Sequence, residues 1–453
     1  MSDKPSPTSQ AHERTQPTLF DLPPAVTPPA PPARQDPRRG ARLRQVNRRQ
    51  LIWGPINLDA QLPEEHPARA ISALIEGLDL SALYAQVEAR EGRAGAPAID
   101  PKILLTLWVF ATSEGEGSAR EIWRLTTLHD AYRWICGGVD VGYHTLSDFR
   151  SQQGEVIDTL ITQVLALLMN QNLVDLSRVA QDGTRIRASA GAGSFRRGQT
   201  LEELMQAARQ HLEEVTREAA DPAVSARRAS ARRRGAQQRL ERLEAALAQI
   251  PEVTETKKRS GAKDATPRVS TTDPDARVMK MGDGGFRPAF NAQFATTADE
   301  ARVIVGVKVT NRGSDAGEST PMIEQIELRT GVRPDEVLLD GGYAQHEAIA
   351  EAAERDVTVY APVPKPRKDD TRDPHQPREG DSEAVAAWRQ RMGTDQAKET
   401  YRQRAATAET VNADAKAHRG LNALAVRGLG KVAGSVALFA LTYNILRFIT
   451  IGV

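Results

Sequence analysis

Apolar residues recur every three or four positions over residues 62–174, the spacing of one face of an α-helix. The stretches ARAISALIEGLDLSALYAQV and PKILLTLWVFATSEG show it most clearly, and Pro101 stands where a first helical turn accepts proline. Further on, GSAREIWRLTTLHDAYRWICGGVDVGYHTLSDFR predicts two short helices, a Gly-rich turn and a third helix opening at Thr145, with Asp148 completing a variant capping box. We therefore expect an all-helical N-terminal domain over residues 51–174.

The three short helices are compatible with a helix-turn-helix, which would make this domain a DNA-binding one. The alternative is a plain packing unit. In either case we expect Trp123, Tyr132, Trp134 and Phe149 to face the core.

A strand pattern begins at Val179 and continues past Asp182, whose side chain is expected on the opposite face from Arg185. Alternation within residues 290–309, broken by a polar turn, predicts a β-hairpin. A helix, a strand ending at Asp340, a second helix and a last strand follow. This order predicts an α/β sheet with mixed strand directions and flanking helices, within a domain spanning residues 175–453.

Two segments interrupt that sheet. Residues 196–270 contain two strongly helical stretches and predict an inserted helical hairpin. Its basic tip is expected to hold Arg227, Arg228, Arg232, Arg233 and Arg234. The tip could contact a DNA backbone, or the hairpin could be a solvated helix pair. Residues 364–395 are charged and contain proline, which predicts a loop.

Composition narrows the class of protein. The 453 residues are 40% apolar with a net charge of +1, and Cys136 is the one cysteine, which excludes a disulfide framework and a cysteine-based zinc site. No secretory signal is recognisable, and the apolar stretch over residues 432–446 is shorter than the roughly 20 residues of a membrane span. We expect a cytoplasmic protein without a membrane partner, in which that stretch is a buried terminal helix.

Residues 1–50 form a proline-rich segment that we expect to be disordered. It carries nine Lys or Arg against four Asp or Glu. It could follow DNA phosphates as a basic arm, or it could be a solvated tail.

Three acids carry the candidate chemistry: Asp182, Asp340 and Glu409. Both aspartates precede glycine, a turn signal, but Asp182 lies among strand residues and Asp340 ends an apolar strand, where α/β sheets bind ligands. Glu409 shares a helical face with Asn412 and Lys416, at i, i+3 and i+7. Converging carboxylates of this kind could hold a pair of divalent metal ions. For the third position, Glu399, Asp395 and Asp414 compete with Glu409.

These acids, with Tyr401, Arg404 and Lys416, resemble the DDE transposases of bacterial insertion sequences. The likeness runs from about Ile56 to Ile449. It includes the segments EEHPARAI, DPKILLTLWVF, GSAREI, GYHTLSDFR, QDGTRIRASAG, GGFRPAFNAQ, LLDGGY and RGLGKVAGSVALFALTYNILR, in this order.

The resemblance implies a ribonuclease H-like catalytic core behind an N-terminal domain that binds terminal inverted repeats. Asp182, Asp340 and Glu409 would be its catalytic residues and would hold two Mg²⁺ ions, with Mn²⁺ as a substitute. Such an enzyme cleaves the ends of its element and joins them to target DNA, as a homodimer or higher oligomer at the bacterial nucleoid. The residues expected to contact DNA are Lys416, Arg404, Tyr401, Asn412, Arg419, Arg232, Arg233 and Arg234.

The family's final motif is matched with one departure. Four residues separate Arg404 from Glu409 where the commonest version has three, while the six residues between Glu409 and Lys416 agree. Two other functions stay open: a catalytically inactive or domesticated DNA-binding regulator, and a structure-selective nuclease such as a resolvase.

Overall fold

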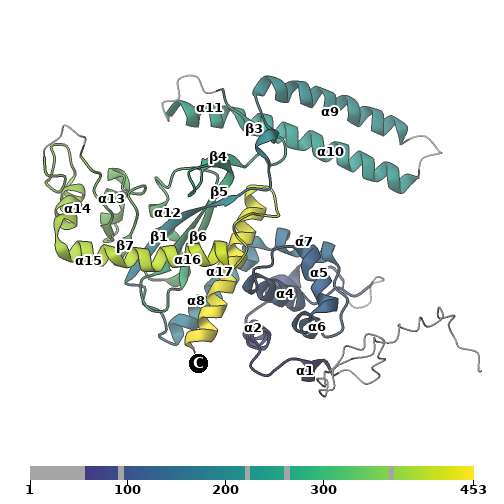
Figure 1. Cartoon of the computed structure of the whole chain (residues 1–453), viewed down its shortest axis with the longest axis horizontal. Coiled ribbons are helices and arrows are strands. Elements are labelled where there is room, and N and C mark those ends of the chain that lie inside the picture. Colours follow the sequence, from purple (N-terminus) through teal and green to yellow (C-terminus); the bar gives the residue numbers. More distant parts are fainter. Residues whose placement is uncertain (1–56, 90–95, 220–224, 260–265, 367–371, 453) are drawn as a thin grey trace, which may run out of the picture. The chain divides into compact units, whose positions relative to one another are not determined.

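The computed structural model describes residues 57–89, 96–219, 225–259, 266–366 and 372–452, and residues 57–453 form one compact unit (Figure 1). The segment expected to be disordered, residues 1–50, lies outside the described residues.

Helices make up the first part of this unit, as the apolar spacing predicts. Pro101 is the first residue of its helix, and the carboxylate of Asp100 caps it by accepting from the Lys102 backbone N–H at 2.8 Å. The helices are α1 (Leu58–Gln61), α2 (Pro67–Glu76), α3 (Ser81–Ala85), α4 (Pro101–Ser113), α5 (Ala119–Leu128), α6 (Asp130–Cys136), α7 (Tyr143–Gln152) and α8 (Gly154–Asn170).

Two details of the three short helices differ from the prediction. Helix α7 begins at Tyr143 and not at Thr145, because the extended backbone of Gly142 ends the preceding loop there, and no side chain caps it. Trp123 is exposed and not in the core, and its ring lies 5.9 Å from that of the partly buried Tyr143. Trp134 is partly buried and packs against the core, as expected. Tyr132 and Phe149 are buried as expected.

The predicted mixed sheet is confirmed, with its strands in the order β4-β5-β1-β7-β8 and β6 also paired with β5. Strand β1 is antiparallel to β5 and parallel to β7, and β8 continues the sheet parallel to β7. Helices α12 (Ser319–Thr330) and α13 (His346–Ala353) connect the later strands. The strands are β1 (Arg178–Arg187), β4 (Arg277–Lys280), β5 (Phe286–Thr297), β6 (Ile304–Thr310), β7 (Glu336–Leu338) and β8 (Thr358–Tyr360). Strand β4 was not predicted.

Helix α17 (Leu429–Ile451) ties the helices to the sheet, packing against α8, α4 and β6. It is long and apolar enough to cross a membrane, but most of its apolar stretch is buried inside the protein. Phe439 stacks edge-on against Phe294 of β5 at 5.4 Å, and Gly434 lies so close to Gly154 of α8 that a Cβ on Gly154 would come within 3.2 Å of the Gly434 Cα. The expected buried terminal helix is confirmed, and the boundary expected at residues 174–175 does not interrupt the core.

The insertion over residues 196–270 is helical and is closed at its base by a small sheet, in which β2 (Phe195–Arg196) pairs with β3 (Val269–Ser270). Helices α9 (Gly198–Glu218) and α10 (Ala226–Ala248) pack side by side, and α11 (Ile250–Arg259) follows (Figure 1). The five arginines expected at the tip lie in the first turns of α10, next to the connection from α9, and are helical. Alanine and arginine favour helix strongly, so the helix begins before them.

The loop predicted for residues 364–395 is wrong in its second half, which forms helix α14 (Glu383–Gly393). Val385, Trp388 and Met392 recur at helical spacing and are buried, and the Trp388 indole donates to the Ala361 carbonyl at 3.0 Å. The many charged residues and prolines nearby hid this apolar face in the sequence.

Candidate active site

Asp182 lies in the middle of β1, paired with Phe294 of β5, and its side chain is mostly buried. Its Oδ1 forms an ion pair with Arg404 Nη2 at 2.9 Å and accepts from the Gly183 backbone N–H at 2.9 Å. Its Oδ2 accepts from Asn412 Nδ2 at 2.9 Å. Two of the residues grouped with it from the sequence therefore contact this carboxylate directly.

Asp340 follows β7, the strand beside β1. Its Oδ1 accepts from the Gly342 backbone N–H at 2.6 Å. A Cβ at Gly342 would come within 2.9 Å of that oxygen, so a larger residue there would displace the carboxylate from this turn.

The two aspartates influence each other electrostatically. Burial raises the pKa of Asp182, and the negative charges of Asp340 and Asp315 raise it further. Arg404 and the Gly183 N–H lower the pKa but do not offset these effects. A bound cation would relieve this crowding of negative charge.

A buried polar cluster on the other face of β1 escaped the sequence-based prediction. Asp315 accepts from Asn291 Nδ2 at 2.8 Å and Gln293 Nε2 at 2.7 Å, and forms an ion pair with Arg185 at 3.0 Å. A Cβ at Gly183 would lie 2.4 Å from Asp315 Oδ1, so glycine lets the cluster approach directly behind Asp182. The available signal was Asn291 and Gln293 alternating with apolar residues in a strand with no solvated face.

One helical segment carries the remaining predicted residues. Tyr401 and Arg404 belong to α15 (Asp395–Arg404), Glu409 ends the π-helical turn η2 (Ala405–Glu409), and α16 (Thr410–Ala417) continues to Lys416. Ala408 packs on Ala180 and Leu338 of the sheet and fixes the segment there.

Tyr401 and Lys416 lie within the electrostatic field of the two aspartates. Burial raises the pKa of Tyr401, and the charges of Asp340 and Asp182 add to this effect while Arg404 opposes it. Burial lowers the pKa of Lys416, as does Arg185, while Asp182 opposes them.

Glu409 is exposed, and its carboxylate does not complete a three-acid cluster. Among the residues that the structure describes, no three His, Cys, Asp or Glu side chains are grouped so that they could hold a metal ion. Glu409 does precede Asn412 by one turn, a rise of about 4.5 Å on the same helical face. The role of Glu409 thus stays a prediction, at one turn from a residue that contacts Asp182.

The competing acids are engaged elsewhere. Glu399 pairs with Arg402, Asp395 pairs with Lys398 at 3.1 Å, and Asp414 pairs with Arg419 at 3.1 Å. Each ion pair joins residues close together in the chain, and the identity of the third acid stays a prediction.

The π-helical turn lies where the spacing departs from the family pattern. Arg404 and Asn412 are eight positions apart, which in a regular α-helix places them roughly 80° apart around the axis. A π turn absorbs one extra residue, so the two behave as if seven apart and reach the same carboxylate. The fourth residue between Arg404 and Glu409 is accommodated here.

Two segments of the chain match models of known protein families. Residues 56–152 match a transposase domain (DUF772), and residues 367–449 match a transposase DDE domain. The chain belongs with the DDE transposases of insertion sequences. No curated protein and no solved structure matches it.

In this transposase the first family match covers α1 to α7, and the second covers the helical segment that contacts Asp182 together with most of α17. The strand residues Asp182 and Asp340 lie outside both matches. Their pairing with the matched segment is a finding of the tertiary structure.

The other residues expected to bind DNA are in different settings. Arg419 is committed to internal contacts, with its Nη1 donating to the Ser113 carbonyl and its Nε to Asp414. Arg232 pairs with Glu218 at 2.6 Å across α9 and α10. Arg233 and Arg234 are exposed on α10, in the insertion.

The donor atoms of this candidate site suit a hard divalent cation, since Asp182 and Asp340 offer carboxylate oxygens. Asn412 Oδ1 and Arg404 Nε are buried beside Asp182 without a hydrogen-bond partner. Asn412 Oδ1 is a further hard oxygen that a cation could use. The oxygen atoms of the two aspartates are therefore suitable ligands for a metal ion. The Glu409 carboxylate is not grouped with them.

Proposed function

We propose that this transposase binds the terminal inverted repeats of its element, cleaves DNA strands there and joins the 3′ ends to target DNA. One observation carries the proposal. A carboxylate on the central strand lies near a second carboxylate that follows the neighbouring strand, and a helical segment places Arg404 and Asn412 on the first.

We further propose a ribonuclease H-like core. The strand order β6-β5-β1-β7-β8 supports it, with β5 antiparallel to both β6 and β1 and the last two strands parallel to β1. Asp182 on the central strand and Asp340 beside it stand where such a sheet binds ligands.

Asp182, Asp340 and Glu409 would hold two divalent cations, Mg²⁺ or Mn²⁺. When bound, such ions activate the attacking oxygen and stabilise the leaving one. Lys416 is close enough to Asp182 to respond to its charge, so an ammonium group is available for a DNA phosphate at the same place. Arg404 and Tyr401 would hold the strand from the other side of η2.

The remaining DNA contacts are proposed on charge and exposure. Helices α5 to α7 would read the terminal repeats, and Arg233 and Arg234 on α10 would contact the DNA backbone. Because two element ends must be handled together, the working complex would be a dimer or a higher oligomer.

The decisive experiment uses a labelled duplex carrying the inverted repeats that flank the reading frame, with added Mg²⁺. We expect cleavage by the wild-type protein, and no product from Asp182→Asn, Asp340→Asn or Glu409→Gln, because each change removes a negative charge that the cation needs. Binding to the duplex, measured by gel shift, should be retained.

The matched controls are Glu399→Gln and Asp395→Asn, which remove exposed carboxylates from α15 and should leave cleavage unchanged. Full cleavage by Asp182→Asn would overturn the assignment. A shifted band without product from the wild-type protein would favour a DNA-binding regulator, a function consistent with the separation of Glu409 from the two aspartates. Cleavage of branched DNA regardless of end sequence would favour a resolvase-like nuclease.

A further inference from the structure

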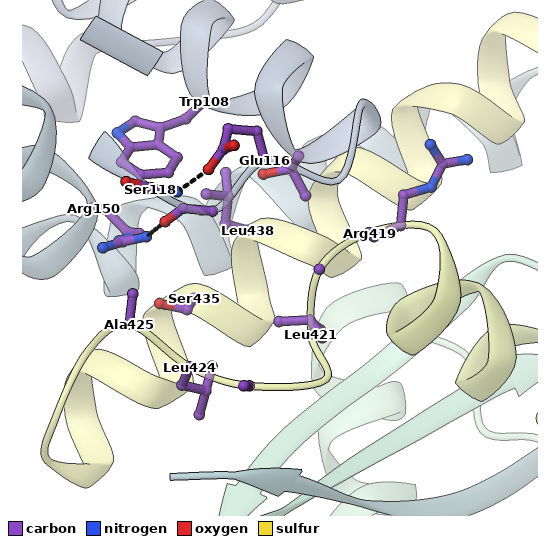
Figure 2. Close-up of a pocket in the computed structure, with 14 residues that line it drawn as sticks. Trp108, Glu116, Ser118, Arg150, Arg419, Leu421, Leu424, Ala425, Ser435 and Leu438 are labelled. Atoms are coloured by element: carbon purple, nitrogen blue, oxygen red, sulfur yellow. Dashed lines mark hydrogen bonds between the residues drawn. The ribbon is translucent and has the colours of Figure 1, made fainter. Parts of the chain in front are cut away.

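A cavity of about 250 Å³ lies away from the two aspartates, between the helical region and the segment that leads from α16 to α17. Figure 2 shows Trp108 of α4, Arg150 of α7 and Ser118 before α5 on one side of it. Leu421 and Leu424 of the connecting segment close the other side. Neither the proposed chemistry nor the resemblance assigns a ligand to this cavity.

Among the residues that line the cavity, Arg150 indicates that a ligand binds there. Only 7% of the residue is exposed, and its guanidinium lies over the Trp108 ring at 4.4 Å. Its Nη1 donates to the Gly117 carbonyl, while its Nε is buried without a hydrogen-bond partner. Burial lowers the pKa of Arg150 to about 10, so the fold disfavours a charge that the side chain still carries at neutral pH.

Comparison with two other buried arginines shows that Arg150 is unusual. Arg389 is equally buried and pairs with Asp381 at 2.8 Å, and Arg329 pairs with Asp158. Within the described part of the chain, no carboxylate forms an ion pair with Arg150 in this way. A buried cation is normally paired, so the missing negative charge is expected from outside the chain.

The remaining charged side chains of the cavity do not pair with Arg150 in the described part of the chain. Arg419 pairs with Asp414 at 3.1 Å. The Glu116 carboxylate accepts from the Ser118 backbone N–H at 2.5 Å, just before α5. The Arg150 guanidinium carries one positive charge without an ion-pair partner, and a phosphodiester carries one negative charge.

We propose that this cavity binds one phosphate group through Arg150. That this phosphate belongs to a DNA strand rests on the proposed function. Arg419 and Gly420 in its wall follow Lys416 by three and four residues, so a strand held at Lys416 has the cavity close by. Free inorganic phosphate offers the same chemistry and is the other source.

The first test needs neither DNA nor cleavage. The melting temperature of the full chain is measured in inorganic phosphate and in chloride at equal ionic strength. We expect phosphate to raise the melting temperature of the wild-type protein and of Arg120→Met, which removes an exposed arginine nearby. It should raise that of Arg150→Met less, because only the general stabilisation that phosphate gives a folded protein is left.

Glu116→Gln keeps the oxygen that accepts from Ser118 but removes a negative charge from the cavity. It should enlarge the phosphate effect, a result that a purely structural Arg150 does not predict. This variant also decides the matter if Arg150→Met fails to fold. A phosphate effect no larger in Glu116→Gln than in the wild-type protein would overturn the proposal.

The second test identifies the source of the phosphate. Affinity for the end-containing duplex is measured at several salt concentrations without Mg²⁺. If the phosphate belongs to DNA, Arg150→Met should reduce the slope of log affinity against log salt by about 0.9, the value of one lost phosphate contact. An unchanged slope together with an intact response to inorganic phosphate in the wild-type protein would assign the cavity to free phosphate and refute the DNA source.

Discussion

At the scale of single residues, Asp182 stands where the fold disfavours a negative charge. Burial is the main cause, and Asp340 and Asp315 add to it. Arg404, Asn412 and the Gly183 N–H hold the carboxylate without compensating fully. Such an arrangement costs stability, and it suits a carboxylate whose partner is a metal ion.

The cost can be measured as a pH dependence of stability. The pKa of Asp182 is higher in the folded than in the unfolded chain, so ionisation destabilises the fold as pH rises above the unfolded value of about 4. Asp182→Asn stays neutral. As pH rises from the unfolded to the folded pKa of Asp182, the free energy of unfolding of Asp182→Asn should therefore increase relative to that of the wild-type protein. Above the folded pKa the difference should stay constant.

Urea denaturation at a series of pH values measures this difference. Asp395→Asn, whose side chain is fully exposed, is the control and should show no such gain. A constant difference between Asp182→Asn and the wild-type protein at every pH would contradict the raised pKa.

At the scale of elements, the π-helical turn η2 sets the relative rotation of α15 and α16. Thr407 and Thr410 support it by donating their hydroxyls to the carbonyls of Gln403 and Ala406, at 2.9 and 2.8 Å. Because η2 holds one residue more than a regular helix needs, the segment should tolerate the loss of one residue and not the gain of one.

Deleting Ala405 should convert η2 to a regular α-helix and keep both Arg404 and Asn412 on Asp182. Inserting one alanine after Ala405 should turn α16 by about 100° relative to α15 and separate them. A double-mutant cycle with Asn412→Ala and Asp182→Ala reports the contact. We expect a coupling energy of about 1–2 kcal/mol in the wild-type and deletion proteins and near zero in the insertion protein.

This measurement does not depend on cleavage, so it holds whether or not the protein proves active. Loss of the coupling in the deletion protein would show that η2 itself, and not its register, forms the site. Where cleavage is observed, it should follow the coupling.

At the scale of the whole compact unit, a glycine contact joins the helical region to the end of α16. Gly115 and Gly420 both have positive φ, and a Cβ on Gly420 would lie 2.6 Å from the Gly115 carbonyl oxygen. Arg419 strengthens this joint by donating to the Ser113 carbonyl at the end of α4. The position of the helix that bears Lys416 thus depends on the helical region.

Gly420→Ala should destabilise the fold by more than backbone strain alone. Gly380→Ala is the matched control, since Gly380 also has positive φ but a Cβ there meets nothing within 4 Å. We expect a loss of about 1–2 kcal/mol for Gly380→Ala and a larger one for Gly420→Ala, measured by urea denaturation. Equal losses of free energy of unfolding in the two variants would show that the contact between Gly115 and Gly420 adjusts to a Cβ without further destabilisation.

Local pattern was sufficient for much of the fold. Apolar spacing located most helices and every strand of the mixed sheet except β4, because these periods reflect one buried face of each element. It failed for α14, where charged residues and prolines hid the spacing of Val385, Trp388 and Met392. It also misjudged Trp123, since spacing alone does not say which face of a short helix finds a partner.

For the candidate site, the sequence by itself determined that one acid lies within a strand and another after a strand, and which residues share a helical face, because each follows from position along one element. Only the tertiary structure decided that Arg404 and Asn412 meet at Asp182, that Asp315 lies behind it, that Glu409 stands apart and that Arg150 is buried without a carboxylate. Contacts between elements distant in the chain depend on how those elements pack, and a linear pattern does not record packing.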